Sequence, residues 1–369
     1  MQLYFETVLK KDLTQYYFLI FLVTIIFCSL IISFTKNGLD RRGGRDLRAI
    51  QSAHTGFVPR LGGLAVYLGT LSIVPISFFS EISLGYFTVL ILSPLPIFVV
   101  GIFEDLGFYM HPARRLGASV VSGCFVIIFY SIWLSKLAIP GIDQLLSFAP
   151  IGVIFTLFAT AGVVNAFNLI DGLNGLSSYI AISTALALSI AAFEVNNVSL
   201  AIFLIMMSVS VLGFFIFNFP FAKIFLGDAG AYTIGHVLVW CSIMLVTSDT
   251  TVSSFAILLI FFWPVADTLL AIWRRWKLGN PAGEPDRLHF HQLVMRLLEI
   301  RFFGRNRRYL SNPLATLALV PMISIPQSLG VFFLRDVQLT FFFTLLLTFL
   351  FFLTYALMVK TAKKRAVKY

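Results

Sequence analysis

Carboxylates that could bind a cation or exchange a proton stand in several short motifs. Glu104 and Asp105 are adjacent and end an apolar run. Neighbouring carboxylates repel each other and are costly at a membrane face. Hard cations, however, take carboxylate oxygens and tolerate paired negative charge. The pair therefore indicates a Mg²⁺ or general-base site, and two solvated surface charges are the alternative.

A row of amides and a carboxylate is the most informative stretch. Asn165, Asn168 and Asp171 follow one another at steps of three, so they share one helix face, and Gly172 and Gly175 then break the helix. Polar residues at the end of a membrane span are a functional hypothesis by default. A helix–helix contact made by the asparagines is the alternative.

A third motif surrounds Asp228, which stands between Gly227 and Gly230. This open setting suits a metal ligand or a neighbour of a phosphate, although such a sequence also forms simple turns. Lys223 can pair with a phosphate as a point charge. Phe225 can stack on a base or pack against the protein.

Two further motifs carry charge at the ends of apolar runs. In Pro59-Arg-Leu-Gly-Gly63 the glycines permit close backbone approach. Free N–H groups there, beside Arg60, would suit a phosphate, and a turn is the alternative. Asp267 follows Pro264 inside a span, where we expect it to face the bundle interior. The alternative is an ion pair between Asp267 and Arg274 or Arg275.

The last motif is Asp286-Arg-Leu-His-Phe-His-Gln292. His289 and His291 are two apart and do not share a helix face, so they converge only on an irregular segment. A Zn²⁺ site lacks a third nearby His or a Cys. Binding of an anionic phosphate or a sugar, with Arg287 alongside, fits better, and solvated loop histidines are the alternative.

The elements that position these motifs must be membrane helices. Of 369 residues, 59% are hydrophobic, 40 are Phe, and only 12% are charged. This composition excludes a soluble enzyme, a disordered chain and a secreted disulfide scaffold. The three cysteines lie in apolar runs and are expected to be reduced. A net charge of +10 would suggest nucleic acid in a soluble protein, but basic cytoplasmic loops explain it here, so no nucleic-acid partner is expected.

Windows of about 20 apolar residues predict an all-α polytopic membrane protein with about eleven transmembrane helices. The predicted spans are 16–34, 61–79, 84–103, 116–134, 149–168, 176–193, 198–219, 230–247, 253–273, 313–333 and 339–359.

The basic residues predict the orientation of these spans. Segments 35–60, 104–115, 169–175, 220–229, 274–312 and 360–369 hold 23 of the 27 Lys and Arg residues. The positive-inside rule makes these segments cytoplasmic, with the N-terminus outside and the C-terminus inside. We expect one integral membrane catalytic domain over 1–369, with active-site loops 35–60, 104–115, 169–175, 220–229 and 274–312.

In this order the motifs resemble those of the polyprenyl-phosphate N-acetylhexosamine-1-phosphate transferases of glycosyltransferase family 4. These include the WecA, TagO and WbpL type enzymes and, more distantly, the MraY translocase. The resemblance runs from Asp40 to about Arg308. The segments that carry it are 54–63, 101–105, 165–175, 218–230, 264–267 and 286–291.

The resemblance implies transfer of a sugar-1-phosphate, GlcNAc-1-phosphate by default, from a UDP-N-acetylhexosamine to undecaprenyl phosphate. UMP is released, and Mg²⁺ is the cofactor, with Mn²⁺ as an alternative. The reaction would start a lipid-linked glycan at the cytoplasmic face of the bacterial inner membrane. A homodimer is compatible with the family. The alternatives are a transporter or flippase of an anionic or lipid-linked substrate, and a phospho-MurNAc-pentapeptide transferase of the MraY type.

The resemblance also implies roles for individual residues. Asp105 and Asp171, with Glu104, would form the catalytic set, and Asp228 with Asp171 would bind the metal. The residues expected to contact substrate are Asn165, Asn168, Asn174, Asn218, Lys223, Phe225, His289, His291, Arg287, Arg60 and His54.

Three positions depart from the family pattern. Glu104 stands where the family commonly has Asp, so its role is less defined than that of Asp105. Asn174 replaces the second Asp of the usual DGLDGL motif; it cannot act as a base but can hydrogen-bond a uracil edge. The histidine motif does not end in a pair of His, which argues against the MraY branch.

Overall fold

The computed structural model describes residues 11–37, 58–79, 83–279 and 289–366, and over these residues the chain is helical without strands. The helices that the site uses most are α6, α9, α12, α14 and α15. In chain order the elements are α2 (Lys11–Asn37), α3 (Gly62–Leu71), α4 (Ile73–Ser77), η2 (Leu84–Phe87), α5 (Thr88–Leu92), α6 (Leu95–Asp105), α7 (Pro112–Tyr130), α8 (Ile142–Ser147), α9 (Ala149–Leu169), α10 (Leu176–Glu194), α11 (Val198–Asn218), α12 (Gly227–Ser248), α13 (Ser254–Ile260), α14 (Phe262–Leu278), α15 (Phe290–Leu298), η3 (Glu299–Phe303), η4 (Arg305–Arg307), α16 (Arg308–Phe332) and α17 (Val337–Ala366).

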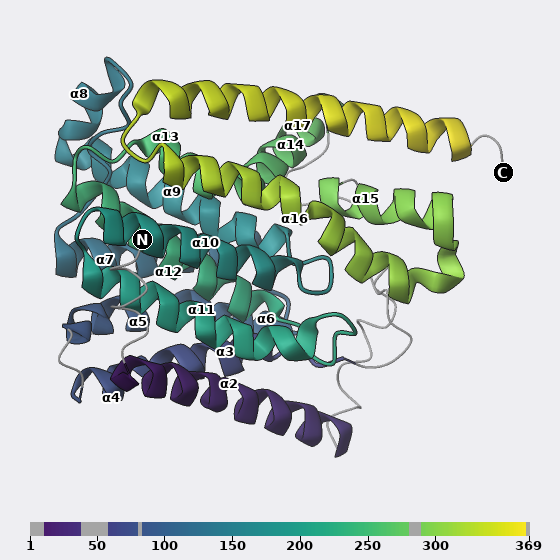
Figure 1. Ribbon diagram of the computed structural model, residues 1–369, viewed down its shortest axis with the longest axis horizontal. Coiled ribbons are helices and arrows are strands. Elements are labelled where there is room, and N and C mark those ends of the chain that lie inside the picture. The colour runs from purple at the N-terminus through teal and green to yellow at the C-terminus, as the bar shows by residue number, and fades with distance from the viewer. Residues whose placement is uncertain (1–10, 38–57, 80–82, 280–288, 367–369) are drawn as a thin grey trace.

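The helices confirm a polytopic membrane protein. Among the described residues, eight helices are long and apolar enough to cross a bilayer, and up to ten spans result if each of two bent pairs is one span. The pairs are 84–92 with 95–105, bent by 47°, and 254–260 with 262–277, bent by 82°. The predicted span at 61–79 corresponds to the shorter apolar stretch Gly62–Ser77. Long helices run along the horizontal axis of Figure 1, with α17 at its upper edge and α2 at its lower edge.

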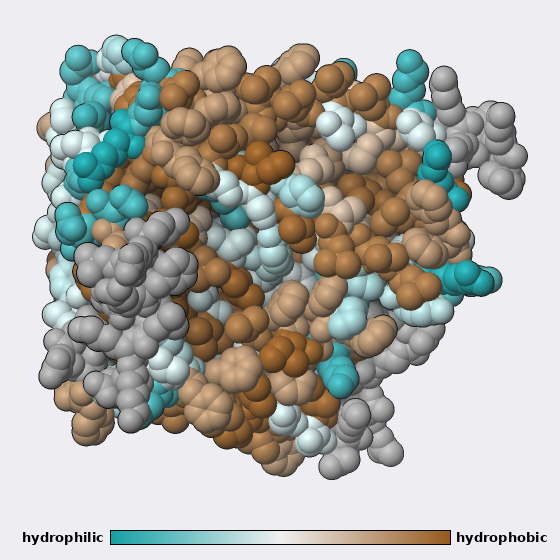
Figure 2. All heavy atoms as spheres, in the orientation of Figure 1, coloured by the Kyte–Doolittle hydropathy of each residue, from teal (hydrophilic) through white to brown (hydrophobic). Residues whose placement is uncertain are grey.

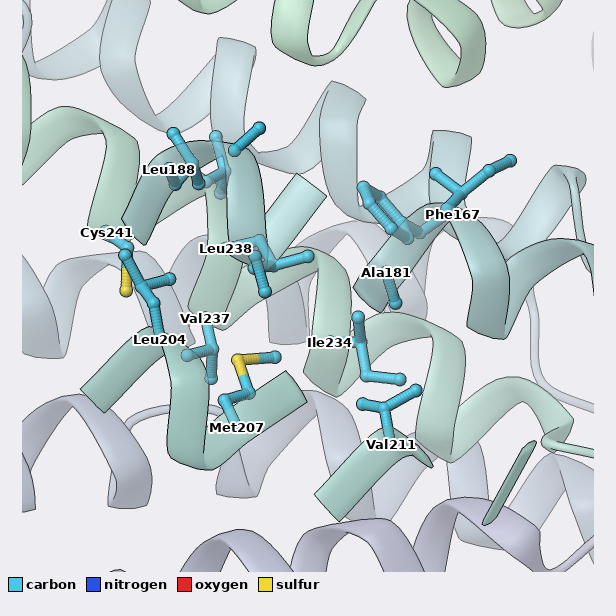
Figure 3. Packing of buried hydrophobic residues seen from close by; sticks show 14 of the residues in the cluster. Phe167, Ala181, Leu188, Leu204, Met207, Val211, Ile234, Val237, Leu238 and Cys241 are labelled. Atoms are coloured by element: carbon cyan, nitrogen blue, oxygen red, sulfur yellow. The ribbon is translucent and has the colours of Figure 1, made fainter. Parts of the chain in front are cut away.

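Helix α12 is the centre of the bundle. Its apolar window is fully buried, whereas that of α17 is 17% buried. Helices α3, α6, α9 and α10 contact it. In Figure 3 its residues Ile234, Val237 and Leu238 lie among side chains from neighbouring helices, including Met207 and Phe167. A helix that is apolar on every side is expected at such a position.

Glycines allow the N-terminal end of α12 to approach α3 and α6 closely. A Cβ on Gly63 would lie 2.2 Å from the backbone nitrogen of Gly230, and one on Gly101 would lie 2.5 Å from Ala229 Cα. Neither side chain would fit without moving backbone. These contacts bring the ends of three helices, and the polar residues on them, to one place.

The bend between α13 and α14 has a local cause. Pro264 is the third residue of α14, so its missing N–H falls in the first turn, where N–H groups have no partner within the helix. Helix α14 then leaves the bundle direction with an exposed apolar face that includes Leu269, Ile272 and Trp276. On the face drawn in Figure 2, hydrophobic residues cover the middle and hydrophilic residues gather toward the two ends, as expected for a chain embedded in lipid.

Candidate active site

Asp105 caps the N-terminal end of α12. Its Oδ1 accepts the backbone N–H of Asp228 at 2.8 Å, and its Oδ2 accepts that of Ala229 at 3.0 Å. The side chain is fully shielded from solvent. The first N–H groups of a helix lack partners within it and carry partial positive charge, so a carboxylate there is stabilising. Asp105 thereby fixes the helix turn that carries Asp228.

Gly227 is required at the start of this turn. Its φ is +76°, and a Cβ would lie 2.1 Å from the carbonyl oxygen of Arg60 and 2.6 Å from Asp105 Oδ2. A side chain would collide with the backbone of one motif and the carboxylate of another. The glycine therefore allows residues from three distant segments to meet.

Asp228 accepts hydrogen bonds from two of the predicted residues. Asn168 Nδ2 donates to its Oδ1 at 2.7 Å, and Arg60 Nη2 donates to the same oxygen at 3.4 Å. Arg60 also lies with its Nε 3.7 Å from Asp105 Oδ1. The guanidinium thus offsets part of the repulsion between the two aspartates, and Asn168 fixes the orientation of the Asp228 carboxylate.

Glu104 joins the same group of charges. Arg115 Nη1, from α7, donates to Glu104 Oε1 at 3.1 Å and lies 3.4 Å from the hydroxyl of Tyr232. The other oxygen, Oε2, is buried and has no hydrogen-bond partner among the described residues. The negative charge of Asp228 is close enough to repel that of Glu104. A buried carboxylate oxygen without a partner is costly unless a cation or a proton meets it.

Asp171 completes the carboxylate set from the loop between α9 and α10. Ser177 Oγ donates to its Oδ1 at 2.5 Å. Burial of the carboxylate raises the pKa of Asp171 to about 6, against the lowering effects of the Ser177 hydrogen bond, the charge of Arg60 and the backbone of Gly227. The charge of Asp228 raises it further. Asp171 can therefore take up and release a proton close to neutral pH.

Both predicted histidines are buried next to this loop, and Asp267 lies between them. Their Nδ1 atoms lie 3.2 Å (His289) and 3.1 Å (His291) from Asp267 Oδ2. The Nε2 atom of His291 would lie 2.6 Å from a Cβ on Gly172, the residue after Asp171. The irregular start of α15 thus brings the two rings together, as their spacing predicts. Arg274, one of the alternative partners of Asp267, donates from its Nη1 to the hydroxyl of Tyr355 at 2.7 Å.

Three of the predicted asparagines contact backbone. Asn165 Nδ2 donates to Ala161 O on its own helix. Asn174 is buried, and its Nδ2 donates to Pro220 O at 2.7 Å. Asn218 is also buried; its Oδ1 accepts the N–H of Gly175 and its Nδ2 donates to Ile224 O. Asn174 and Asn218 therefore connect the 169–175 and 219–226 loops, an arrangement that their sequence spacing does not reveal.

Lys223 is exposed, and Phe225 is partly buried. The backbone of Phe225 pairs with the Arg60 segment: its N–H donates to Pro59 O, and its carbonyl accepts the N–H of Gly62. The N–H of Gly63 donates to Leu226 O. The prediction that the two glycine N–H groups are free for a phosphate is therefore wrong, because a backbone ladder between the two loops uses both.

His54 and Arg287 lie outside the described residues. Two described residues that contact the site were not among the predicted site residues, Arg115 and Ser177. Asp267 was singled out in the sequence as an expensive intramembrane charge, but without a link to the histidines. Arg115 and Ser177 carry weaker signals, because an arginine at the start of a span and a serine in the first turn of a helix are common without any function.

The group has more negative than positive charge. Glu104, Asp105, Asp171 and Asp228 face two guanidinium groups, those of Arg60 and Arg115, within the described chain. Because Glu104 Oε2 is also buried without a partner, the residues present fit a divalent cation with oxygen ligands. Carboxylates of this kind suit phosphoryl transfer, in which charge neutralisation and positioning supply most of the catalysis.

Known proteins with similar sequences point to one family of membrane enzymes. The model of glycosyl transferase family 4 matches residues 87–246, from η2 to α12. A probable undecaprenyl-phosphate N-acetylglucosaminyl 1-phosphate transferase of Bacillus subtilis is 28% identical over 280 residues, covering 74% of this chain and 76% of the relative. The undecaprenyl-phosphate alpha-N-acetylglucosaminyl 1-phosphate transferase of Escherichia coli K12 is 26% identical over 279 residues, covering 73% and 74%.

A third relative, the decaprenyl-phosphate N-acetylglucosaminephosphotransferase of Mycobacterium leprae, is 29% identical over 310 residues, covering 73% of this chain and 75% of the relative. The matched range contains Glu104, Asp105, Asp171 and Asp228, which the fold gathers at the N-terminal end of α12. The chain is therefore similar to glycosyl transferase family 4 over residues 87–246, and to polyprenyl-phosphate N-acetylglucosamine-1-phosphate transferases over about three quarters of its length.

Proposed function

We propose that the protein transfers an N-acetylhexosamine-1-phosphate, GlcNAc-1-phosphate by default, from a UDP-sugar to undecaprenyl phosphate. An oxygen of the lipid phosphate bonds to the β-phosphorus of the donor, the bond between that phosphorus and the bridging oxygen breaks, and UMP leaves. The observation that carries the proposal is the meeting of carboxylates from three loops at the N-terminus of α12. The named activities of the relatives supply the substrate classes.

Mg²⁺, or Mn²⁺, is the cofactor that the carboxylates fit. Asp228 and the unpartnered Glu104 Oε2 would hold it, in place of the Asp228–Asp171 pair implied by the family resemblance, because Asp171 is assigned to proton transfer. When bound, the ion neutralises negative charge on the donor pyrophosphate. Asn168 and Arg60 keep Asp228 oriented in the absence of substrate, so the protein does not have to reorganise this ligand during the reaction.

Asp171 is the residue best suited to move a proton. A pKa of about 6 matches the second pKa of a phosphate monoester, which is also about 6, so Asp171 can take the last proton from the lipid phosphate. We assign Asp105 a positioning role, in place of the base role implied by the family resemblance. Both of its oxygens already accept backbone N–H groups, and its side chain is fully shielded.

The other predicted residues are proposed to bind the donor. His289 and His291 are proposed to meet its phosphate or sugar, with Lys223 as an additional cation. Phe225 remains the proposed neighbour of the uracil. Asn174 and Asn218 are proposed to position the two loops that they connect. Their side-chain amides already hydrogen-bond to backbone groups of these loops.

The polyprenyl chain needs an apolar surface that opens to the bilayer. The exposed face of α14 offers one, since Leu269, Ile272 and Trp276 are each more than half exposed and the helix leaves the bundle at 82° to α13. The same helix carries Asp267, which contacts both histidines. We propose that the polyprenyl chain lies along this outer face of α14, while the opposite face, which carries Asp267, meets the histidines.

We also propose eleven crossings, an outside N-terminus and an active site at the cytoplasmic face of the inner membrane, within a single catalytic domain. The support is that segments assigned to one side by the positive-inside rule contact one another through their described residues. These segments are 35–60, 104–115, 169–175, 220–229 and 274–312. Segments on opposite sides of a bilayer could not do so.

The test uses purified full-length protein with undecaprenyl phosphate, Mg²⁺ and UDP-GlcNAc labelled in the sugar. We expect label in a butanol-extractable lipid, formation of UMP in equal amount, and reversal by added UMP. The matched control is Asp228→Asn, which keeps the shape of the side chain and removes its charge. Movement of intact substrate across vesicles without UMP formation would instead support a transporter.

A panel of other UDP-N-acetylhexosamines in the same assay defines the sugar. Equal failure with every UDP-sugar, by protein that remains folded, would refute the proposed reaction.

A further inference from the structure

Asp267 is an intramembrane carboxylate that the mechanism above does not use. It lies on α14 and is 1% exposed. Its Oδ2 lies within hydrogen-bond distance of Nδ1 of both His289 and His291, and its Oδ1 accepts the backbone N–H of Phe290 at 2.9 Å. A charged group at this depth is expensive, so three converging partners indicate that its position matters.

These contacts determine where the imidazole protons lie. An ionised carboxylate can only accept hydrogen bonds, so each ring must carry a proton on Nδ1. In a neutral ring, Nε2 is then left with its lone pair. The rings of His289 and His291 are close to parallel, with centroids 5.5 Å apart and planes 22° apart, as expected when one carboxylate orients both.

The free nitrogen of His291 lies against the catalytic loop. Its Nε2 is buried and has no hydrogen-bond partner among the described residues. It occupies the space that a Gly172 side chain would need, while Gly172 itself is exposed and follows Asp171 directly. An unpaired acceptor that touches a proton-transferring loop is costly unless it serves a ligand.

We propose that Asp267 is a positioning residue for the transfer reaction. It fixes the Nδ1–H form of His289 and His291 and holds Nε2 of His291 against the Asp171–Gly172 loop, where it meets a polar group of the substrate. The inference rests on the proposed function and extends the active site to the bent helix α14.

A metal ion held by the same three side chains is the rival interpretation. Their ligand atoms all lie within 4.8 Å of one another. Such an ion would need both Nδ1 atoms deprotonated, and the carboxylate would have to serve it while also accepting the Phe290 N–H. The hydrogen-bonded arrangement satisfies all of these groups without an ion.

The first test is Asp267→Asn. The asparagine amide can take two orientations. With its oxygen toward the histidines, its N–H₂ group faces the Phe290 N–H, so two donors oppose each other. With its N–H₂ group toward the histidines, both rings must accept at Nδ1 and carry their proton on Nε2. We expect kcat to fall about 10- to 100-fold, the usual effect of removing a group that orients a functional histidine. Asp267→Glu should recover part of the loss. The matched control is Asp249→Asn, a carboxylate paired with Arg335 at the other end of the helices, which should leave transfer unchanged.

The second test separates the two nitrogens of His291. His291→Asn keeps a donor where Nδ1 lies and removes Nε2, whereas His291→Gln keeps a polar atom near Nε2. We expect the Asn variant to fold normally, as judged by its thermal unfolding, but to lose more activity than the Gln variant. In the double variant with Asp267→Asn the losses should not multiply, because Asp267 acts through the same ring. Multiplying losses would assign Asp267 a structural role and overturn the proposal.

The third test does not depend on activity. The chain has five histidines, so ¹⁵N-histidine spectra can be assigned with single variants. We expect the wild-type spectra to show His289 and His291 protonated on Nδ1, and Asp267→Asn to change this tautomer. That result would support the proposal whether or not UDP-GlcNAc is the donor. Nε2–H forms, or a stoichiometric metal ion that Asp267→Asn removes, would overturn it. Wild-type protein with the expected tautomers but no transfer would contradict only the proposed function.

Discussion

Replacing Asp105 by Asn tests whether this residue builds the site or takes part in proton transfer. The carboxylate accepts two backbone N–H groups at the N-terminus of α12, at 2.8 and 3.0 Å. An amide has one acceptor oxygen, so one N–H would face an N–H₂ group without a partner. An unsatisfied buried donor costs about 1–3 kcal/mol, and loss of the negative charge at the helix end costs about 0.3–1 kcal/mol more.

Relief of repulsion with Asp228 offsets part of this cost. We therefore expect Asp105→Asn to lower the free energy of unfolding by about 1–2 kcal/mol. Because the turn that carries Asp228 shifts, kcat should also fall by about 10²-fold, the effect of misplacing a reacting group by about 1 Å.

Thermal unfolding in detergent, followed by tryptophan fluorescence, should be measured on the same preparations as transfer at saturating donor and lipid. Asp249→Asn serves as the control for loss of a carboxylate away from the site. If Asp105→Asn lost activity at unchanged or increased stability, the capping argument would be refuted and Asp105 would be restored as a candidate base. If neither property changed, Asp105 would have no part in the site.

Four other outcomes follow from the same geometry. Asp228→Asn should abolish transfer while the protein still inserts and folds, because it removes charge neutralisation worth several kcal/mol in the transition state; near-normal turnover at ordinary Mg²⁺ would remove Asp228 from the metal site. Glu104→Asp should stay within about tenfold of wild type, because the flexible Arg115 can follow a shorter carboxylate; an inactive variant would show that the longer side chain is required. Burial raises the pKa of Asp171 from 3.8 to about 6, so its ionised form is present above that pH and lost below it, and kcat at saturating metal should fall as the pH drops through about 6. An acid limb near pH 4, or one that persists in the residual activity of Asp171→Asn, would contradict this role. A C-terminal alkaline phosphatase fusion should be inactive and a C-terminal fluorescent fusion bright, since the basic loops place that end inside; the reverse would overturn the assigned face.

The sequence predicts the helical membrane fold well because long apolar runs have few alternatives in a bilayer. It also singles out Asn168 and Asp228, whose side chains the fold brings within hydrogen-bond distance. Its limits lie in contacts between segments. Whether a carboxylate caps a helix or faces a substrate depends on which backbone lies beside it, and for Asp105 that backbone is 123 residues away.

The same limit explains the glycine motif beside Arg60. The Gly62-Gly63 pair suggested free N–H groups, but Phe225 and Leu226 supply carbonyl partners that no local pattern indicates. Asp267 is the opposite case. Its cost inside the membrane was evident from the sequence, but its partners were identified only when the loop histidines folded back onto α14.

The burial of α12 suggests that the central and outer helices have different roles. A helix surrounded by protein on every side cannot shift without disturbing all of its neighbours, so the end that carries Asp228 stays still while substrates come and go. The outer helices are less buried, and only 17% of the apolar window of α17 is buried inside the protein. If helices move when the lipid substrate enters and its product leaves, we expect the less buried α14 and α17 to move before α12. In such an arrangement the alignment of the reacting groups is set once, at folding. We expect the turnover rate to depend on how readily the outer helices, α14 and α17, move apart.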